Sequence, residues 1–241
     1  ENYLLGIDLG TTVVKAAVFD RMTGARLAAA SRRLPVDAGA DGKREQALAD
    51  VDRALDEMLA ELRREIGAGW GCVSGVGLAA QGGSTIIAER DTGRALTPMT
   101  LWNDGRAHPY LQRLIAVHPP RYWRSFSLSD MPGFGLARLL EMRETAPQWL
   151  DPTRYIYIGA GEYAFFHLTG AWYQDACNAL QIGCNDARRK RLTEKPLREL
   201  GVPLSFFAAL RPGHATQPLS ARAAVRFGLP AGIPVAGPYI D

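Results

Sequence analysis

Short apolar runs separated by polar turns open the chain. Residues 3–7, 13–20 and about 25–34 form such runs, which predicts three short antiparallel strands. Apolar residues then recur at three- and four-residue intervals from Leu48 to Ile66, which predicts a helix with one apolar face. The nearly continuous apolar run Val73–Ala80 indicates a strand buried on both faces after a helical crossover. This order of elements predicts an α/β fold.

The rest of the chain mixes weaker strand patterns with helical ones. Strands are predicted over 84–89 and 96–101, joined by a turn at Asp91-Thr92-Gly93. The stretch from about 104 to 180 is mostly helical, and the segment after Pro234 is an apolar strand. The predicted helices are Leu111–Val117, Phe134–Arg143, Glu162–Leu168, Leu197–Leu200 and Ala221–Phe227.

The turn between the first two strands carries the most informative polar residues. Asp8 comes at the end of the first apolar run, Gly10-Thr11-Thr12 forms the turn, and Lys15 lies near the start of the second run. We expect Gly10 to permit the turn because glycine enters left-handed backbone regions that other residues avoid. Backbone N–H groups and threonine hydroxyls in such a turn can hold phosphate oxygens, while Asp8 can face a hydrated Mg²⁺. The alternative is an ordinary hairpin whose Asp and Thr residues satisfy the turn.

Two more polar groups follow predicted strands. Gln81-Gly82-Gly83 comes directly after the strand at 73–80, at the end where open α/β sheets bind ligands. Trp102 offers an aromatic face to the apolar side of a sugar, and Asn103 and Asp104 can bond its hydroxyls. Alternatively, Trp102 is a core residue and Asp104 is the N-cap of the next helix.

Composition excludes several other classes of function. The 241 residues are 47% hydrophobic with a formal charge of +3, so the chain can bury a core and carries no basic excess for nucleic acid. Its apolar runs are shorter than the roughly 20 residues that span a bilayer, so we expect a cytoplasmic protein without membrane contact. Three cysteines without C-x-x-C spacing and four scattered histidines support neither disulfides nor a metal site made by protein ligands alone.

Five segments, taken in chain order, carry a resemblance to a known family. They are DLGTT followed by VVK at 8–15, QGG at 81–83, LWND at 101–104, LTG at 168–170 and GIPVAGPYID at 232–241. Together they resemble the FGGY carbohydrate kinases, which belong to the actin-like ATPase superfamily. The first segment alone also resembles seventy-kilodalton heat-shock chaperones and hexokinases, so the reaction class depends on the whole set.

The resemblance implies a ribonuclease-H-like α/β domain of the actin-like superfamily. Its expected parts are a mixed five-stranded sheet, flanking helices and a helical insertion at about 104–180 beside the substrate. It also implies that residues 1–241 form an amino-terminal domain and that a second, ATP-binding domain is absent from this chain.

The implied function is ATP-dependent phosphorylation of a sugar or polyol hydroxyl, with a ketopentose such as xylulose as the expected acceptor. Asp8 would orient Mg²⁺ through water, and Asp241 would take the proton of the attacking hydroxyl. The other implied contacts are Gly10, Thr11, Thr12 and Lys15 with the phosphates of ATP, and Gln81, Gly82, Gly83, Trp102, Asn103 and Asp104 with the acceptor.

Gly82 and Gly83 depart from the family pattern. D-xylulokinases carry Met-His and glycerol kinases carry Arg-Glu at these two positions, where the side chains contact substrate. The departure leaves open a non-catalytic, sugar-binding regulatory protein of the same fold. The sequence also leaves open whether the chain forms a homodimer.

Overall fold

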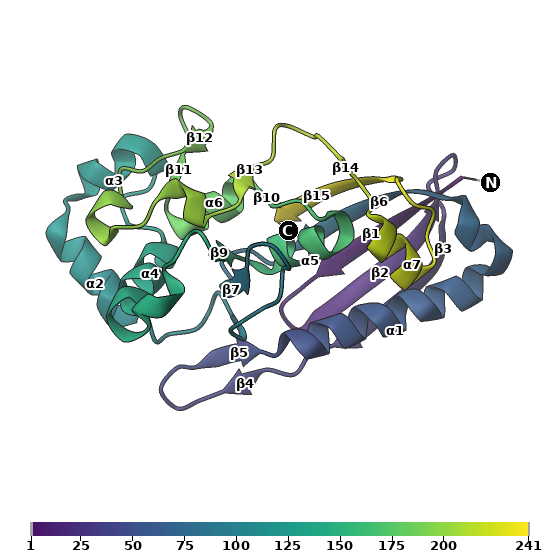
Figure 1. Cartoon of the computed structure of the whole chain (residues 1–241), viewed down its shortest axis with the longest axis horizontal. Coiled ribbons are helices and arrows are strands. Elements are labelled where there is room, and N and C mark those ends of the chain that lie inside the picture. Colours follow the sequence, from purple (N-terminus) through teal and green to yellow (C-terminus); the bar gives the residue numbers. More distant parts are fainter. Residues whose placement is uncertain (1, 241) are drawn as a thin grey trace.

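A mixed six-stranded sheet forms the centre of the computed structural model, which describes residues 2–240 of the chain. The strands are β1 Tyr3–Leu9, β2 Val13–Asp20, β3 Arg26–Arg33, β6 Val73–Ala80, β14 Gln217–Pro218 and β15 Pro234–Ile240. Their order is β14-β15-β6-β1-β2-β3 (Figure 1), in which β1, β6 and β15 run parallel. The sequence predicted five strands, because the two residues of β14 are too few to show a strand pattern.

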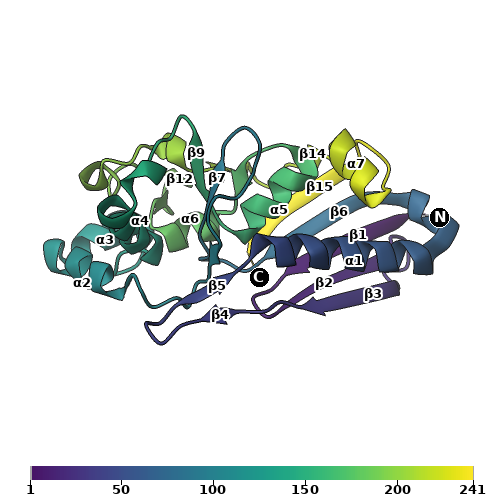
Figure 2. The same ribbon diagram turned by 60° about the horizontal axis from the view of Figure 1, so that its bottom comes forward.

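Three helices cover one face of this sheet. They are α1 Leu48–Ile66, α5 Ala160–Thr169 and α7 Ala221–Phe227, which lie over the same face in Figures 1 and 2. Because strand side chains alternate between faces, every second residue of β1 and β2 joins the core under these helices. Each leucine fully buried there contributes about 1.5–3 kcal/mol. This core includes Leu5, Ile7, Leu9, Val14, Ala16 and Val18 from the sheet and Met58, Leu59 and Leu62 from α1.

The opposite face of the sheet holds a cavity of about 500 Å³. Gly77 and Ala79 of β6 line this cavity and are only half-buried. The expectation that residues 73–80 are buried on both faces is therefore wrong for the described chain. Burial alternates along β6 because helices cover only one side of it.

The strands predicted at 84–89 and 96–101 are shorter in the structure. β7 (Ile86–Glu89) pairs with β9 (Tyr155–Ile158), and only Met99–Thr100 forms a strand, β8, in the second segment. Pro98 lacks a backbone N–H, and beyond it β8 pairs with β5, while Thr100 also forms an isolated bridge with Thr85. The small pairings are β4 Asp37–Ala38 with β5 Arg44–Gln46, β5 with β8, β10 Tyr173–Gln174 with β13 Ala209–Leu210, and β11 Asn185–Asp186 with β12 Arg191–Leu192.

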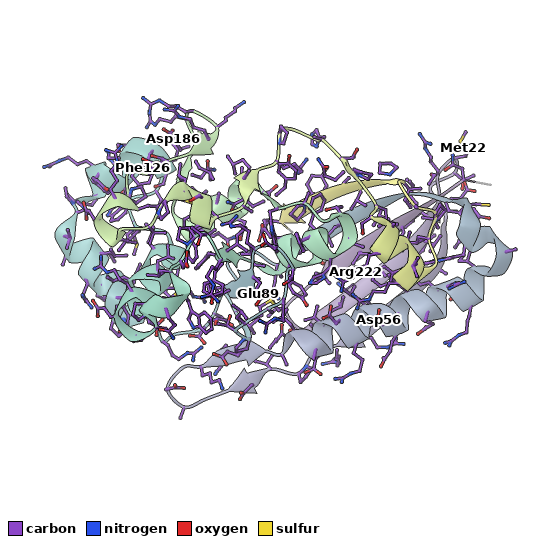
Figure 3. The ribbon with its side chains drawn as sticks, viewed as in Figure 1. Met22, Asp56, Glu89, Phe126, Asp186 and Arg222 are labelled. Atoms are coloured by element: carbon purple, nitrogen blue, oxygen red, sulfur yellow. The ribbon has the colours of Figure 1, made fainter. Side chains whose placement is uncertain are left out.

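A helical region with its own apolar core adjoins the sheet. Figure 3 places Phe126 and Asp186 in this region and Met22 at the far end of the sheet. The α-helices of this region are α2 His108–Val117, α3 Pro120–Ser127, α4 Phe134–Thr145 and α6 Ala176–Ile182. The 3-10 helices of the described residues are η1 Gly67–Cys72, η2 Pro147–Trp149, η3 Arg198–Leu200 and η4 Leu204–Phe206. The sequence did not predict α3 and α6, which are short and bury few apolar residues each.

Membrane insertion would need a long apolar helix. Within residues 2–240, no helix combines the length and the apolar character that a membrane crossing requires.

A buried carboxyl group connects the start of α5 with the helical region. The Gly159 N–H donates to Glu162 Oε2 at 2.6 Å, and Asn178 Nδ2 donates to Glu162 Oε1 at 3.2 Å. Asn178 Oδ1 in turn accepts the N–H of Gly83 at 3.4 Å. Burial raises the pKa of Glu162 to about 7, although its hydrogen bonds act in the opposite direction. The Gly83 N–H is therefore bonded, through Asn178, to a carboxyl group whose charge changes near neutral pH.

Replacing Glu162 by Gln is expected to remove a pH-dependent part of the folding stability. Glu162 keeps its proton up to about pH 7 in the folded chain, whereas it loses that proton near 4.5 when unfolded. The folded state therefore binds more protons between these values, and the free energy of unfolding falls as pH rises, by about 3 kcal/mol in total.

Urea denaturation of both proteins across this pH range measures the effect. The unfolding free energy of the wild type minus that of Glu162→Gln is expected to fall by about 3 kcal/mol between the two pKa values. A difference that stays constant with pH would show that the pKa of Glu162 is the same in the folded and unfolded chain, which would contradict the raised value.

Candidate active site

The carboxyl ends of β1, β6 and β15 meet at one edge of the sheet. Leu9 pairs with Ala80, and Ala80 pairs with Ile240, so the segments that follow these strands are neighbours. The Gln81 N–H donates to the carbonyl oxygen of Leu9 at 3.0 Å, which ties the segment after β6 to the end of β1. The turn at 10–12 and the segment at 81–83 are therefore brought together, as ligand sites in open α/β sheets are.

Gly10 is needed in the turn for a reason that the sequence did not reveal. It is absent from the glycines with positive φ, so it does not use the left-handed region. A Cβ atom at this position would lie 2.7 Å from the carbonyl oxygen of Val13, closer than side-chain carbons approach in proteins. The constraint at Gly10 is close approach of the backbone, which corrects the expectation of a left-handed conformation.

A chain of hydrogen bonds joins the turn at 10–12 to the two segments that are predicted to contact the phosphate acceptor, Gln81–Gly83 and Trp102–Asp104. Trp102 Nε1 donates to Thr11 Oγ1 at 3.2 Å, and Thr11 Oγ1 donates to Gln81 Oε1 at 3.0 Å. Gln46 Nε2 donates to the carbonyl oxygen of Thr11 at 2.7 Å and fixes its backbone. Gln81 is buried, whereas Trp102 is 56% exposed and leaves its indole face available to a ligand.

A cavity of about 450 Å³ lies beside this chain of bonds. None of its described lining residues carries a charged side chain, while hydroxyl, amide and aromatic groups are all present. Such a lining suits a neutral molecule rich in hydroxyl groups. The lining residues are Thr11, Gln81, Gly82, Gly83, Ser84, Trp102, Gly133, Phe134, Gly135, Tyr157, Gln181, Ile182 and Ile240.

A buried arginine that does not line the cavity bonds to the backbone at or next to both of these segments. Arg138 on α4 donates to the carbonyl oxygens of Gly83 at 3.3 Å and Thr100 at 3.1 Å, and also to that of Leu101. It further donates to Thr85 Oγ1 at 2.8 Å. Burial lowers the pKa of Arg138, which shows the desolvation that these bonds must offset. The shape of the cavity wall therefore depends on this guanidinium group.

Asp8 and Lys15 lie on the face of the sheet that is opposite the helices. Lys15 Nζ is 3.7 Å from Asp8 Oδ2, and both residues line the cavity of about 500 Å³ described above. That cavity shares no described lining residue with the cavity beside Thr11. Asp8 and Lys15 thus form one group, and Thr11, Gln81–Gly83 and Trp102 form another.

Asp8 fits a metal ion held through water. Its Oδ1 atom is buried and has no hydrogen-bond partner in the described chain. An unpartnered carboxylate oxygen is costly to bury, and a hydrated Mg²⁺ would satisfy it. Among residues 2–240, no group of three or more His, Cys, Asp or Glu side chains could hold a metal ion without help from a ligand.

Other predicted site residues lie outside the acceptor cavity. Asn103 and Thr12 are exposed and do not line it. Asp104 is buried, and its carboxylate accepts the Arg44 N–H at 2.7 Å and the Arg106 guanidinium at 2.9 Å. Burial opposes ionisation of Asp104, but these hydrogen bonds together hold its pKa below the usual value. Asp104 is also not the N-cap of α2, a place taken by Ala107.

The predicted base, Asp241, lies outside the described residues. Its neighbour Ile240 is the last described residue of β15 and lines the acceptor cavity. The position of the Asp241 carboxylate therefore stays a prediction.

Sequence reasoning missed three parts of the cavity wall. Gly133–Gly135 at the start of α4, Tyr157 on β9 and Gln181 near the end of α6 all line it. Tyr157 is distant in sequence and hydrogen-bonds to the Thr85 hydroxyl at 2.8 Å. The only available signal was the glycine pair at 82–83, which indicated that some other group contacts the acceptor.

Comparisons with known proteins identify the family to which the chain is similar. The sequence profile of the FGGY family of carbohydrate kinases, N-terminal domain, matches residues 3–241. Erythritol kinase from Brucella abortus is 27% identical over 100% of this chain and 46% of that relative. Glycerol kinase from Xanthobacter autotrophicus is 27% identical over 87% of this chain and 43% of that relative.

Solved structures confirm the predicted fold class. The xylulose kinase from Rhodospirillum rubrum superimposes with a TM-score of 0.89 at 23% identity, covering 100% of this chain and 49% of that one. The chain spans less than half the length of the curated relatives described above. Because the family profile matches nearly its whole length, the chain belongs to the FGGY family of carbohydrate kinases, in which it corresponds to the amino-terminal domain.

Proposed function

We propose that the protein carrying this chain transfers the γ-phosphoryl group of ATP to a hydroxyl of a neutral sugar or polyol. One observation carries the proposal: the Thr11 hydroxyl in the glycine-threonine turn is bonded to Gln81 and Trp102, which line an uncharged cavity of about 450 Å³. A turn suited to phosphate and a cavity suited to hydroxyl groups thus share a wall. Phosphoryl transfer needs such adjacent sites for donor and acceptor.

The donor side would use the turn and the two charged residues behind it. Gly10, Thr11 and Thr12 would hold phosphate oxygens through backbone N–H groups and hydroxyls, with Lys15 supplying positive charge. Asp8 would hold a hydrated Mg²⁺, which neutralises charge on the phosphates when bound. The adenine pocket would lie in a second domain, in keeping with the greater length of the relatives.

The acceptor side would use the cavity. Trp102 would contact the apolar side of the acceptor while Gln81 and the backbone at Gly82–Gly83 bond its hydroxyls. Asp241 would accept the proton of the attacking hydroxyl as its oxygen bonds to the γ-phosphorus and ADP departs. We propose a ketopentose such as xylulose as the first acceptor to test, followed by erythritol and glycerol, which the names of two relatives suggest.

A second candidate is a non-catalytic, sugar-binding protein of the same fold. The glycines at 82 and 83 favour it, because they leave the acceptor without two side chains that catalytic relatives use. Binding would then occur in the same cavity without transfer.

An acceptor panel separates these candidates. The full-length protein is expected to release ADP from Mg-ATP with at least one of xylulose, other ketopentoses, erythritol and glycerol. Gluconate is the matched control, because its carboxylate would meet no cationic side chain among the described lining residues. Acceptor binding without ADP release would favour the regulatory protein, and ADP release independent of any acceptor would contradict both candidates.

Replacing Asp8 by Asn is expected to lower activity about 10- to 100-fold, the usual cost of losing a group that orients a metal through water. The Mg²⁺ concentration for half-maximal activity should rise as well, because the negative charge of the carboxylate is lost. Steady-state assays over a Mg²⁺ titration measure both effects. Asp91→Asn, at an exposed turn far along the chain, is the control, and an Asp8→Asn enzyme indistinguishable from it would exclude the assigned role.

A further inference from the structure

The Gln181 carboxamide lies directly over the glycine pair at 82–83. A Cβ atom at Gly82 would be 2.6 Å from Gln181 Nε2 and 2.8 Å from Oε1. A Cβ atom at Gly83 would also overlap Gln181 Oε1. Side chains at 82 and 83 and the observed position of Gln181 are therefore mutually exclusive. The two glycines leave the space that this side chain fills.

Close packing of two helices delivers Gln181 to this place. A Cβ atom at Gly133 would be 2.5 Å from the Gly183 Cα, and one at Gly135 would be 2.6 Å from the Ile182 Cα. The end of α6 can thus approach the start of α4 only because both positions are glycine. Residue 181, one position earlier, is held at the rim of the cavity.

The Gln181 carboxamide has no hydrogen bond to the rest of the described chain, and its side chain is exposed to the cavity. It offers two N–H donors and one carbonyl acceptor. Hydroxyl groups on neighbouring carbons of a sugar or polyol both donate and accept, so they match such an amide. A carboxylate or phosphate on the acceptor would find no cation among the described lining residues.

We propose that Gln181 is a specificity-determining residue that hydrogen-bonds the hydroxyls of a neutral acceptor, in the space left by Gly82 and Gly83. The inference rests on the proposed acceptor cavity and adds to it the side chain that recognises the acceptor. Selectivity then comes from α6 rather than from the segment after β6.

Substitution at Gln181 tests this role in the full-length protein. Gln181→Leu keeps the bulk and removes the amide, and Gln181→Ala removes both. Each is expected to raise the KM for the acceptor about 10-fold, the effect of about one lost hydrogen bond, and to change the ranking of acceptors. The KM for ATP should stay the same. Leu180→Ala is the matched control on the same helix, since Leu180 does not line the cavity.

A double-mutant cycle separates recognition from simple filling of space. Gly82→Ala should displace the carboxamide and raise the acceptor KM in the wild-type background. In the Gln181→Ala background the same substitution should have little further effect, because no amide is left to displace. Independent, additive effects of the two substitutions would contradict the proposal.

Calorimetric titration of the same acceptors, without ATP, distinguishes failure of this inference from failure of the proposed function. Acceptor binding that Gln181→Leu weakens, without any turnover, would support Gln181 and reject the kinase proposal. Turnover with unchanged acceptor affinity and ranking in both Gln181 variants would reject Gln181 alone. If the wild-type protein binds no neutral acceptor, both proposals fail.

Discussion

Parallel pairing of β1, β6 and β15 is the constraint on which the rest of the site depends. It places the ends of three strands that are far apart in the sequence at one edge of the sheet. The turn after β1 and the segment after β6 then lie close enough for the Thr11 hydroxyl to bond to Gln81. Polar groups suited to phosphate and to hydroxyls become neighbours through backbone geometry, before any ligand is present.

Glycine and one buried cation shape the acceptor side of that edge. Gly133 and Gly135 allow α6 to approach α4, and Gly82 and Gly83 leave space for the Gln181 side chain of α6. Arg138 holds the opposite side of the same segments through carbonyl oxygens. The cavity thus owes its form to close backbone contacts, which tolerate few substitutions. Its described lining remains free of charge even though a guanidinium group lies just behind it.

Local patterns were enough to predict the sheet strands at 3–7, 13–20 and 73–80, which are clear apolar runs, and the helix at Leu48–Ile66, which has a clear apolar period. The segment at Gln81–Gly83 was predicted at the end of a strand where open α/β sheets bind ligands, whereas its contact with the turn at Gly10–Thr12 was found only in the structure. Contacts between distant segments were beyond this reasoning. Asp104 binds Arg106 and the backbone of Arg44 instead of lining the cavity, and Gln181 reaches the site from α6, which buries too few apolar side chains to show a helical pattern.

The most direct test is a crystal structure of the full-length protein with a neutral acceptor and a non-hydrolysable ATP analogue. The account predicts that the acceptor lies between Trp102 and Gln81–Gly83, with Gln181 bonded to its hydroxyls and one hydroxyl facing the phosphates at the Thr11 turn. An acceptor bound elsewhere, or phosphates held away from that turn, would contradict it.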